Sequence, residues 1–157
     1  MPDISRPMIA AIGVAAIVIV AFGVLAFSLA FMPLGNTTPP GETEYTVLLS
    51  GSLQEVDSAH TGSGTVQLVE SDTGSQAIRF IDVSITNGPD LYVYLSKKSS
   101  FSGISDDPGE YVSLGLTPAV TGNFTVSIPD TVNGQDYASV LIWCQAFAVL
   151  FTYAIFA

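Results

Sequence analysis

The chain has 157 residues, of which 48% are hydrophobic and only 11% are charged, with a formal net charge of −10 and a pI near 4.1. An acidic surface repels phosphate backbones and anionic headgroups, so these totals argue against nucleic-acid binding and against peripheral attachment to lipid. The single cysteine cannot close an intramolecular disulfide, so one modest domain must be stabilised by a packed core.

The first segment is an uncharged apolar run from Met8 to Met32. As a helix it would be roughly 37 Å long, enough to cross a bilayer with some tilt. Its length favours an uncleaved anchor over a signal peptide cleaved near Ala30. Arg6 precedes the run and no basic residue follows before Arg79, so the positive-inside rule places residues 1–7 in the cytoplasm. We therefore expect a single-pass cell-membrane protein with an extracytoplasmic remainder, or a secreted domain if the segment is cleaved.

Residues 33–44 are rich in proline, glycine and threonine, a composition typical of an extended linker. The linker separates the anchor from a domain at residues 45–157. Asn36 and Asn123 each begin an Asn-x-Thr sequon, which is an N-glycosylation candidate if the chain lies outside the cytoplasm. The chain is thus a candidate glycoprotein of the cell surface.

Short apolar runs separated by turn residues fill the domain, and no segment has a convincing 3.6-residue period. Glycines between the runs, such as Gly88, suit a tight turn through their freedom at φ > 0. We therefore expect an all-β fold, an antiparallel β-sandwich or barrel of about seven to nine strands. The expected strands include residues 45–49, 64–70, 77–86, 91–95, 124–128 and 139–151.

Alternation predicts which side chains of these strands share a face. Tyr92 and Tyr94 are expected to face outward from the strand at 91–95. The sets expected on one face are Val66 with Leu68; Ile81, Val83 and Ile85; Leu91, Val93 and Leu95; and Phe124, Val126 and Ile128.

Residues 139–151 contain the only tryptophan and the only cysteine, and their β-branched and aromatic content favours a central strand covered on both faces. A membrane helix over residues 138–157 is the alternative, because the segment is uncharged. No basic residue follows to anchor such a helix. As a strand, the two expected faces are Val140, Ile142, Cys144 and Ala146 on one side, and Leu141, Trp143, Phe147 and Val149 on the other.

Few residues of the domain could carry chemistry. One histidine is too few for a blue-copper or four-ligand zinc site, and neither a nucleophile elbow nor a c-type haem motif occurs. Asp106, Asp107 and Glu110 fit a solvated acidic turn better than a calcium loop, so no metal site is expected. On the residues alone, a small buried hydrophobe is favoured over a reactive thiol for Cys144, and a hydrogen-bonded loop residue over a ligand for His60.

Four blocks of the domain carry a resemblance to a known family: Gly51 with residues 60–66, residues 87–96, Leu114-Gly115, and residues 137–147. Together they resemble the DM-thirteen domain, a DOMON-associated extracellular family proposed to work in electron transfer. Leu53 replaces that family's usual aromatic residue. The resemblance implies that Cys144 is the redox residue, as a bare thiol or by holding a prosthetic group. Haem is one candidate group, with His60 as a second candidate for binding it.

The sequence therefore predicts a membrane-anchored, extracytoplasmic β-sandwich that serves as an accessory redox or electron-transfer module centred on Cys144, rather than a stand-alone enzyme. Its expected partners are the membrane, through the N-terminal helix, and other redox or cell-surface proteins. The alternative is a non-catalytic surface module for adhesion or envelope assembly. In that alternative Cys144 belongs to the core, and Tyr92, Tyr94 and Tyr111 form a contact surface.

Overall fold

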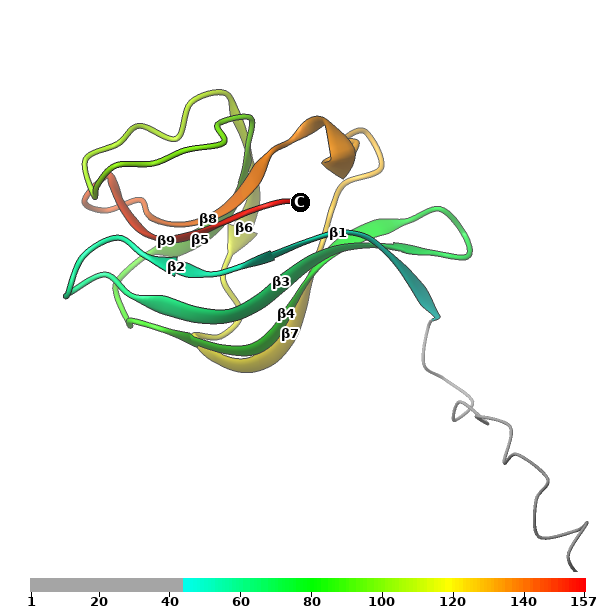
Figure 1. Cartoon of the computed structure of the whole chain (residues 1–157). Helices are drawn as coiled ribbons and strands as arrows, with labels where there is room; N and C mark the ends of the chain where they lie inside the picture. The colour runs from blue at the N-terminus through cyan, green and yellow to red at the C-terminus, as the bar shows by residue number, and fades with distance from the viewer. Residues whose placement is uncertain (1–43) are drawn as a thin grey trace, which may run out of the picture. The chain divides into compact units, whose positions relative to one another are not determined.

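Two antiparallel β-sheets form the computed structural model, which describes residues 44–157 (Figure 1). The first sheet has the strand order β1-β3-β4-β7 and the second has the order β2-β9-β8-β5-β6. The all-β, antiparallel two-sheet prediction is confirmed, with nine strands in this part of the chain. The strands are β1 (Tyr45–Ser52), β2 (Gln54–Glu55), β3 (Gly62–Ser71), β4 (Gln76–Ile85), β5 (Leu91–Ser96), β6 (Tyr111–Leu116), β7 (Thr121–Ser127), β8 (Ser139–Cys144) and β9 (Val149–Ile155).

Several predictions concern residues that the structure does not describe. The cytoplasmic segment 1–7, the anchor 8–32 and Asn36 lie outside the described residues, as does the linker 33–44 except for its last residue. From Glu44 onward, the only helical segment is the short 3₁₀ turn Gly134–Asp136. No helix in residues 44–157 has both the length and the apolar character needed to cross a membrane.

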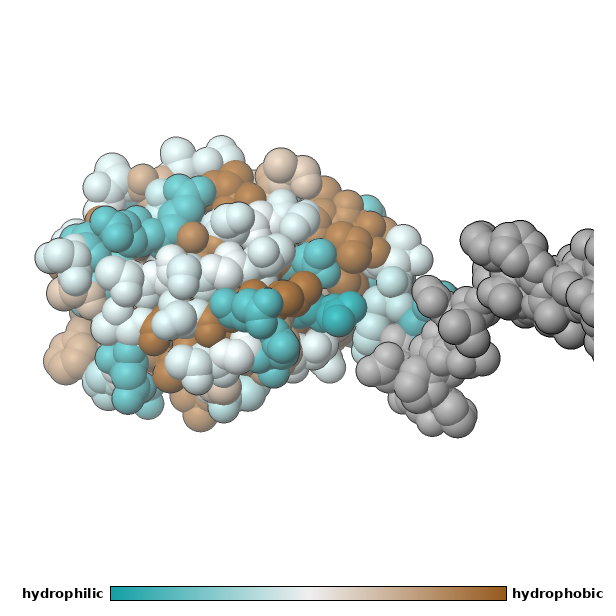
Figure 2. Space-filling model, turned by 60° about the horizontal axis from the view of Figure 1, so that its bottom comes forward, coloured by the Kyte–Doolittle hydropathy of each residue, from teal (hydrophilic) through white to brown (hydrophobic). Residues whose placement is uncertain are grey.

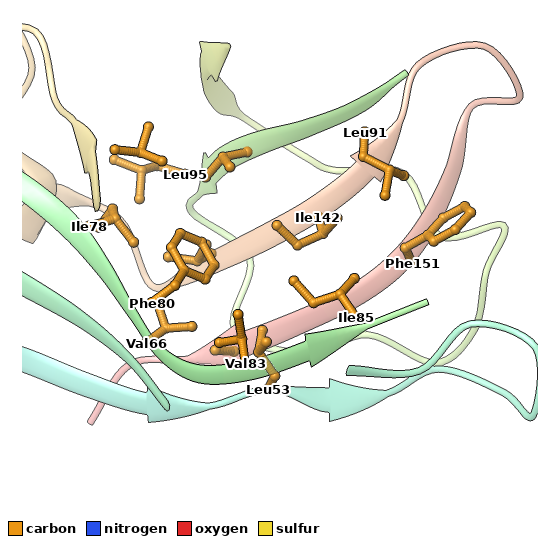
Figure 3. Packing of buried hydrophobic residues seen from close by; sticks show 14 of the residues in the cluster. Leu53, Val66, Ile78, Phe80, Val83, Ile85, Leu91, Leu95, Ile142 and Phe151 are labelled. Atoms are coloured by element: carbon orange, nitrogen blue, oxygen red, sulfur yellow. The ribbon is translucent and has the colours of Figure 1, made fainter. Parts of the chain in front are cut away.

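The inner faces of the two sheets pack against each other and form the main core. Figure 3 shows Val66, Ile78 and Phe80 from the first sheet opposite Leu95 and Ile142 from the second. A large apolar side chain buried in this way contributes roughly 1.5 to 3 kcal/mol relative to an exposed one. On the face of the molecule drawn in Figure 2, hydrophobic residues lie in small groups among polar ones. The inward sets predicted for β3, β5 and the strand at 124–128 are confirmed.

The set predicted for β4 is wrong at Ile81, because this strand contains a bulge. Phe80 and Val83 are both buried in the main core although three positions separate them. The pairing of β4 with β7 shifts register between these two residues, and Asp82 between them has a φ of 49°. The extra residue reverses the inward and outward alternation, so Ile81 is only half-buried.

The strand predicted at 139–151 is wrong in its extent, because the chain reverses after Cys144. Residues 145–148 form a turn between β8 and β9, in which Ala148 has a φ of 52°. The predicted alternation holds within β8, with Val140, Ile142 and Cys144 in the main core and Leu141 and Trp143 on the outer face. Beyond Cys144 it fails: Ala146 and Phe147 are exposed turn residues, and Val149 packs against the main core.

The same hairpin contradicts the alternative of a membrane helix over residues 138–157. β8 pairs with β5 on one side and with β9 on the other, so its backbone N–H and C=O groups bond between strands rather than within a helix. Two short elements, β2 and β6, were not among the predicted strands. β6 alternates exposed and half-buried residues and contains Gly115, so its apolar pattern is weak.

Gly64 lies across from the bulge of β4 and provides a test of it. Gly64 has a φ of 106°, and a Cβ there would lie 2.7 Å from both Asp82 O and Val83 Cα. Gly115 has a similar φ of 101° with no heavy atom within 4 Å of a Cβ. Alanine at either position meets backbone strain on the order of 1 to 3 kcal/mol. Gly64→Ala should lower the free energy of unfolding by a further ~1 to 3 kcal/mol, because its Cβ overlaps the bulge.

Equilibrium denaturation of the two alanine variants beside the wild type measures this difference. Equal losses for Gly64→Ala and Gly115→Ala would show that the close approach of β3 to the bulge contributes nothing to stability.

Candidate functional site

Cys144 is the last residue of β8, and two strand pairings position it. It lies opposite Leu91 of β5 and opposite Val149 of β9. Its side chain belongs to the main core, and the residue has 0% exposed area. The thiol donates a hydrogen bond from Sγ to the carbonyl oxygen of Pro89 at 3.0 Å. The thiol is therefore shielded from solvent and held in one orientation.

The turn Asn87–Asp90, which leads into β5, covers this thiol. The backbone N–H of Gln145 donates to the carbonyl oxygen of Asp90 at 3.0 Å, so two successive residues at the end of β8 are tied to the turn. Pro89 and Asp90 are themselves exposed. The Cys144 sulfur thus lies one hydrogen bond beneath a solvent-exposed turn.

Glycine is required at position 88 for a different structural reason from the one expected. The residue with positive φ in this turn is Asp90, at 52°, whereas Gly88 is not among the residues with positive φ. A Cβ on Gly88 would lie 2.5 Å from Cζ of Phe151, so the position requires glycine for space. Figure 3 shows the Phe151 ring at this end of the core beside Leu91.

His60 lies in the short loop after β2 and has partners of its own. Its Nδ1 is 2.9 Å from Oδ1 of Asp57, and the ring meets the Phe151 ring edge-on with centroids 4.7 Å apart. Asp57 Oδ1 also accepts the backbone N–H groups of Ala59 and His60, each at 2.8 Å. These bonds, first that from Ala59 and then that from the His60 ring, hold the pKa of Asp57 below its usual 3.8. The loop is therefore a closed hydrogen-bonded turn.

The structure relates His60 to Cys144 through the core rather than by direct bonding. His60 contacts Phe151, Phe151 lies against Gly88, and Pro89 accepts the thiol hydrogen bond. Within residues 44–157, the His60 ring is hydrogen-bonded to Asp57 and the Cys144 thiol to Pro89, and the two side chains are not bonded to each other. A joint role for the two in binding a cofactor stays a prediction.

A haem does not fit Cys144 in this arrangement. Ligation would need an open position beside Sγ and space for a macrocycle, yet the residue is fully buried and its sulfur is bonded to Pro89. Between Glu44 and Ala157, no cluster of three or more histidine, cysteine, aspartate or glutamate residues could hold a metal ion. The surroundings of Cys144 therefore suit a free thiol rather than a sulfur that holds a prosthetic group.

The outer face of the second sheet carries an aromatic stack, whereas the sequence grouped Tyr94 and Tyr111 only as members of an exposed contact surface. Tyr111 of β6 stacks on Tyr94 of β5 with ring centroids 4.4 Å apart, and Tyr94 in turn lies 6.2 Å from Trp143 of β8. Tyr94 does face outward as predicted, yet it is only 1% exposed. Alternation could place Tyr94 and Trp143 on strands, but it could not pair either with the unrecognised β6.

The segment between β5 and β6, residues 97–110, covers part of this outer face. Its Phe101 ring packs against Tyr153 with centroids 4.9 Å apart, and the carbonyl oxygen of Ile104 accepts the backbone N–H of Leu150 at 3.0 Å. Burial raises the pKa of Tyr94, and a hydrogen bond from the Gln145 side chain opposes that rise in part. The outer face is therefore a second, smaller core.

The acidic residues of the covering segment are engaged within it. Asp106 accepts the backbone N–H of Ser102 at 2.5 Å, and this bond is the main cause that lowers the pKa of Asp106. Asp107 accepts the backbone N–H of Gly109, and Glu110 forms an ion pair with Lys97. These carboxylates organise the loop.

Asn123, the glycosylation candidate within the described residues, is an exposed residue of β7. Its Oδ1 accepts the backbone N–H of Asp82 at the β4 bulge, 2.7 Å away. A glycan would be attached to Nδ2, the other terminal atom of this side chain. Modification of Asn123 stays a prediction.

A comparison with protein families finds one described as electron transfer DM13, whose model matches residues 53–156. This range covers more than half of the chain and contains Cys144, its turn, His60 and the aromatic stack. No curated protein matches the chain. No solved structure matches it either.

Gly88→Val tests the packing beneath the turn that holds the thiol. The added methyl groups would overlap the Phe151 ring, so the free energy of unfolding should fall by about 1 to 3 kcal/mol. Gly103→Val is the matched control, because a Cβ at Gly103 meets nothing within 4 Å. Thermal and denaturant unfolding measure both variants. A Gly88→Val protein as stable as Gly103→Val would contradict the tight contact with Phe151.

Proposed function

Because the chain belongs to the DM13 electron-transfer family, we propose that it is a membrane-anchored, extracytoplasmic redox module whose working residue is Cys144. Residues 8–32 would hold the module at the membrane, and its partners would be redox proteins at the same surface. The module passes electrons and is not a stand-alone enzyme. The proposal proceeds from the family, from the one cysteine of the chain and from the setting of that cysteine in the fold.

The observation that carries the proposal is the hydrogen bond from Cys144 Sγ to the Pro89 carbonyl beneath an exposed turn. A buried thiol is protected from the attack of peroxides and other thiols, which need direct access to sulfur. An electron needs no such access, because it can move through the protein to a nearby acceptor. The setting thus favours electron transfer over exchange chemistry at this sulfur.

The chemical step can be written with atoms and electrons balanced. The reduced thiol gives one electron to a one-electron oxidant and one proton to water, leaving a thiyl radical. The Pro89 carbonyl holds the S–H bond, and water at the exposed turn of Pro89 and Asp90 takes the proton. Reduction of the radical by a one-electron donor, with uptake of a proton, restores the thiol. A mixed disulfide would instead require the turn at residues 87–90 to open.

A non-catalytic surface module for adhesion or envelope assembly is the second candidate function. Phe147 favours it, since this residue lies 68% exposed at the tip of the β8–β9 turn. The contact surface first expected for this role, Tyr92, Tyr94 and Tyr111, is wrong in one member, because Tyr94 is buried. The redox function explains why the thiol is placed beside the turn, whereas adhesion does not use Cys144.

Cys144→Ser tests the redox function while preserving the fold. The serine hydroxyl can donate to the Pro89 carbonyl as the thiol does, so the melting temperature should change little. Electron transfer should be lost, because an alcohol is not oxidised where a thiol is. Protein-film voltammetry of the full chain measures this. Cys144→Ala is the packing control and should lose roughly 1 kcal/mol of stability to a small cavity.

A folded Cys144→Ser protein that transfers electrons like the wild type would contradict the redox role of this residue. The surface-module function would then replace it.

Limited proteolysis of intact cells tests the anchor and its orientation. A protease added outside should release a soluble fragment that begins within residues 36–44, because this stretch joins the apolar run to the first strand. Amino-terminal sequencing of the released fragment identifies the cut. Cells permeabilised before the protease is added provide the control. A domain that is cut only after permeabilisation would contradict the extracytoplasmic location.

A further inference from the structure

Three aromatic rings connect the surface of the second sheet to the strand that carries Cys144. Tyr111 stacks on Tyr94 with an interplanar angle of 17°, and Tyr94 and Trp143 are inclined by only 22°. The rings come from three adjacent strands in the order β6, β5 and β8. Both centroid separations, 4.4 and 6.2 Å, lie near or within the usual contact range of aromatic pairs.

The two ends of this row differ in exposure. Tyr111 is 46% exposed, whereas Trp143 is 7% exposed and directly precedes Cys144 in the chain. Tyr94 between them is buried against Leu141 and Leu150 in the smaller core. One end of the row therefore meets solvent, and the other is one peptide unit from the thiol.

The row consists of tyrosine and tryptophan and ends one residue before a cysteine, and these three are among the amino-acid side chains that lose an electron most easily. The three aromatic rings lie at contact distance, so an oxidising equivalent can move between them in short steps, and short steps are faster because electronic coupling falls steeply with distance. The last step, from Trp143 to Cys144, runs along the backbone of β8, because the two side chains lie on opposite faces of this strand. Burial matters as well, because the covering segment at residues 97–110 limits the access of other reactants to the intermediate radicals.

We propose that Tyr111, Tyr94 and Trp143 form a relay that carries oxidising equivalents from a one-electron oxidant docked at Tyr111 to the thiol of Cys144. The inference rests on the proposed redox role of Cys144 and adds the route and the docking point. The partner is a one-electron acceptor, such as a metal-centred redox protein, that approaches the outer face of the second sheet beside β6.

Each step of the relay balances. The oxidant takes one electron from Tyr111, whose phenol proton passes to water. Tyr111 regains an electron and a proton as Tyr94 is oxidised, and the phenol proton of Tyr94 leaves beside Gln145, an exposed residue whose Nε2 lies 3.0 Å from the Tyr94 oxygen. Trp143 then gives an electron to Tyr94, which takes a proton back from water beside Gln145. The Trp143 radical takes an electron from Cys144, whose thiol proton passes to water at the turn that carries Pro89. The net result is one reduced oxidant, one thiyl radical and one proton in water.

Photochemical oxidation of the full chain in mild detergent tests the relay. Flash-generated tris(bipyridine)ruthenium(III) serves as the one-electron oxidant, and air traps the thiyl radical as sulfur oxyacids. The readout is the initial rate at which Cys144 stops reacting with iodoacetamide after unfolding. Transient absorption records the tyrosyl and tryptophanyl radicals in the same samples.

Tyr94→Phe keeps the ring in the stack and removes the oxidisable phenol. It should slow the loss of the Cys144 thiol by about tenfold or more, which corresponds to ~1.4 kcal/mol of added barrier. Trp143→Phe should do the same. Tyr153→Phe is the matched control and should leave the rate unchanged, because Tyr153 lies on the same face but packs on Phe101 outside the row. Melting temperatures establish that each variant is folded.

The outcomes separate the relay from the redox function. Equal rates in the wild type and in folded Tyr94→Phe would overturn the relay and leave the redox role of Cys144 intact. Tyrosyl radicals that form in the wild type without loss of the Cys144 thiol would also overturn it. The redox role itself fails only if Cys144→Ser transfers electrons like the wild type.

Discussion

The burial of β8 on both faces is the constraint on which the rest of the domain depends. All six of its residues are buried, and it pairs with β5 and β9 on its two sides. One face joins the core between the sheets, and the other needs a cover of its own, which the segment between β5 and β6 provides together with the aromatic rings. Its register depends on the fit of particular side chains, since a shift of one residue would turn Trp143 into the main core and Cys144 out of it.

This strand also explains how one chain segment serves two purposes. Successive residues of a strand point to opposite faces, so Cys144 enters the main core while Trp143 enters the outer aromatic row. The thiol is then fixed from a third direction by Pro89, and its neighbour Gln145 is tied to Asp90 and to Tyr94. The proposed redox residue and its proposed route to the surface therefore depend on the same few hydrogen bonds at the end of β8.

The turn at residues 87–90 is the solvent-exposed part of the site. Its Pro89 and Asp90 face solvent, and Asp90 has a φ of 52°, which is an unfavourable region for most residues. Gly88 beneath it has no space for a side chain because Phe151 fills that volume. The His60 ring meets the same Phe151 ring edge-on. The packing of Gly88 on Phe151 thus fixes the turn whose Pro89 carbonyl accepts the thiol hydrogen bond.

Much of the fold could be predicted from residue patterns. Alternation identified the inward residues of β3, β5 and β8, because an antiparallel sheet with one face on a core imposes period two on its apolar residues. It failed at Ile81 and after Cys144, where a bulge and a turn use Asp82 and Ala148 at positive φ. Alanine gives no signal for such a conformation and aspartate only a weak one. The cost of roughly 1 to 3 kcal/mol is offset by contacts that the sequence pattern does not show.

The sequence by itself determined the all-β class, the family and Cys144 as the residue of interest, because these depend on residue types and local spacing. The tertiary structure alone decided that the thiol is closed beneath Pro89, that His60 reaches it only through Phe151, and that Tyr111 stacks on Tyr94. These three facts depend on strand order and loop paths, which bring together residues far apart in the chain. No local pattern encodes that proximity, since it results from the packing of the whole domain.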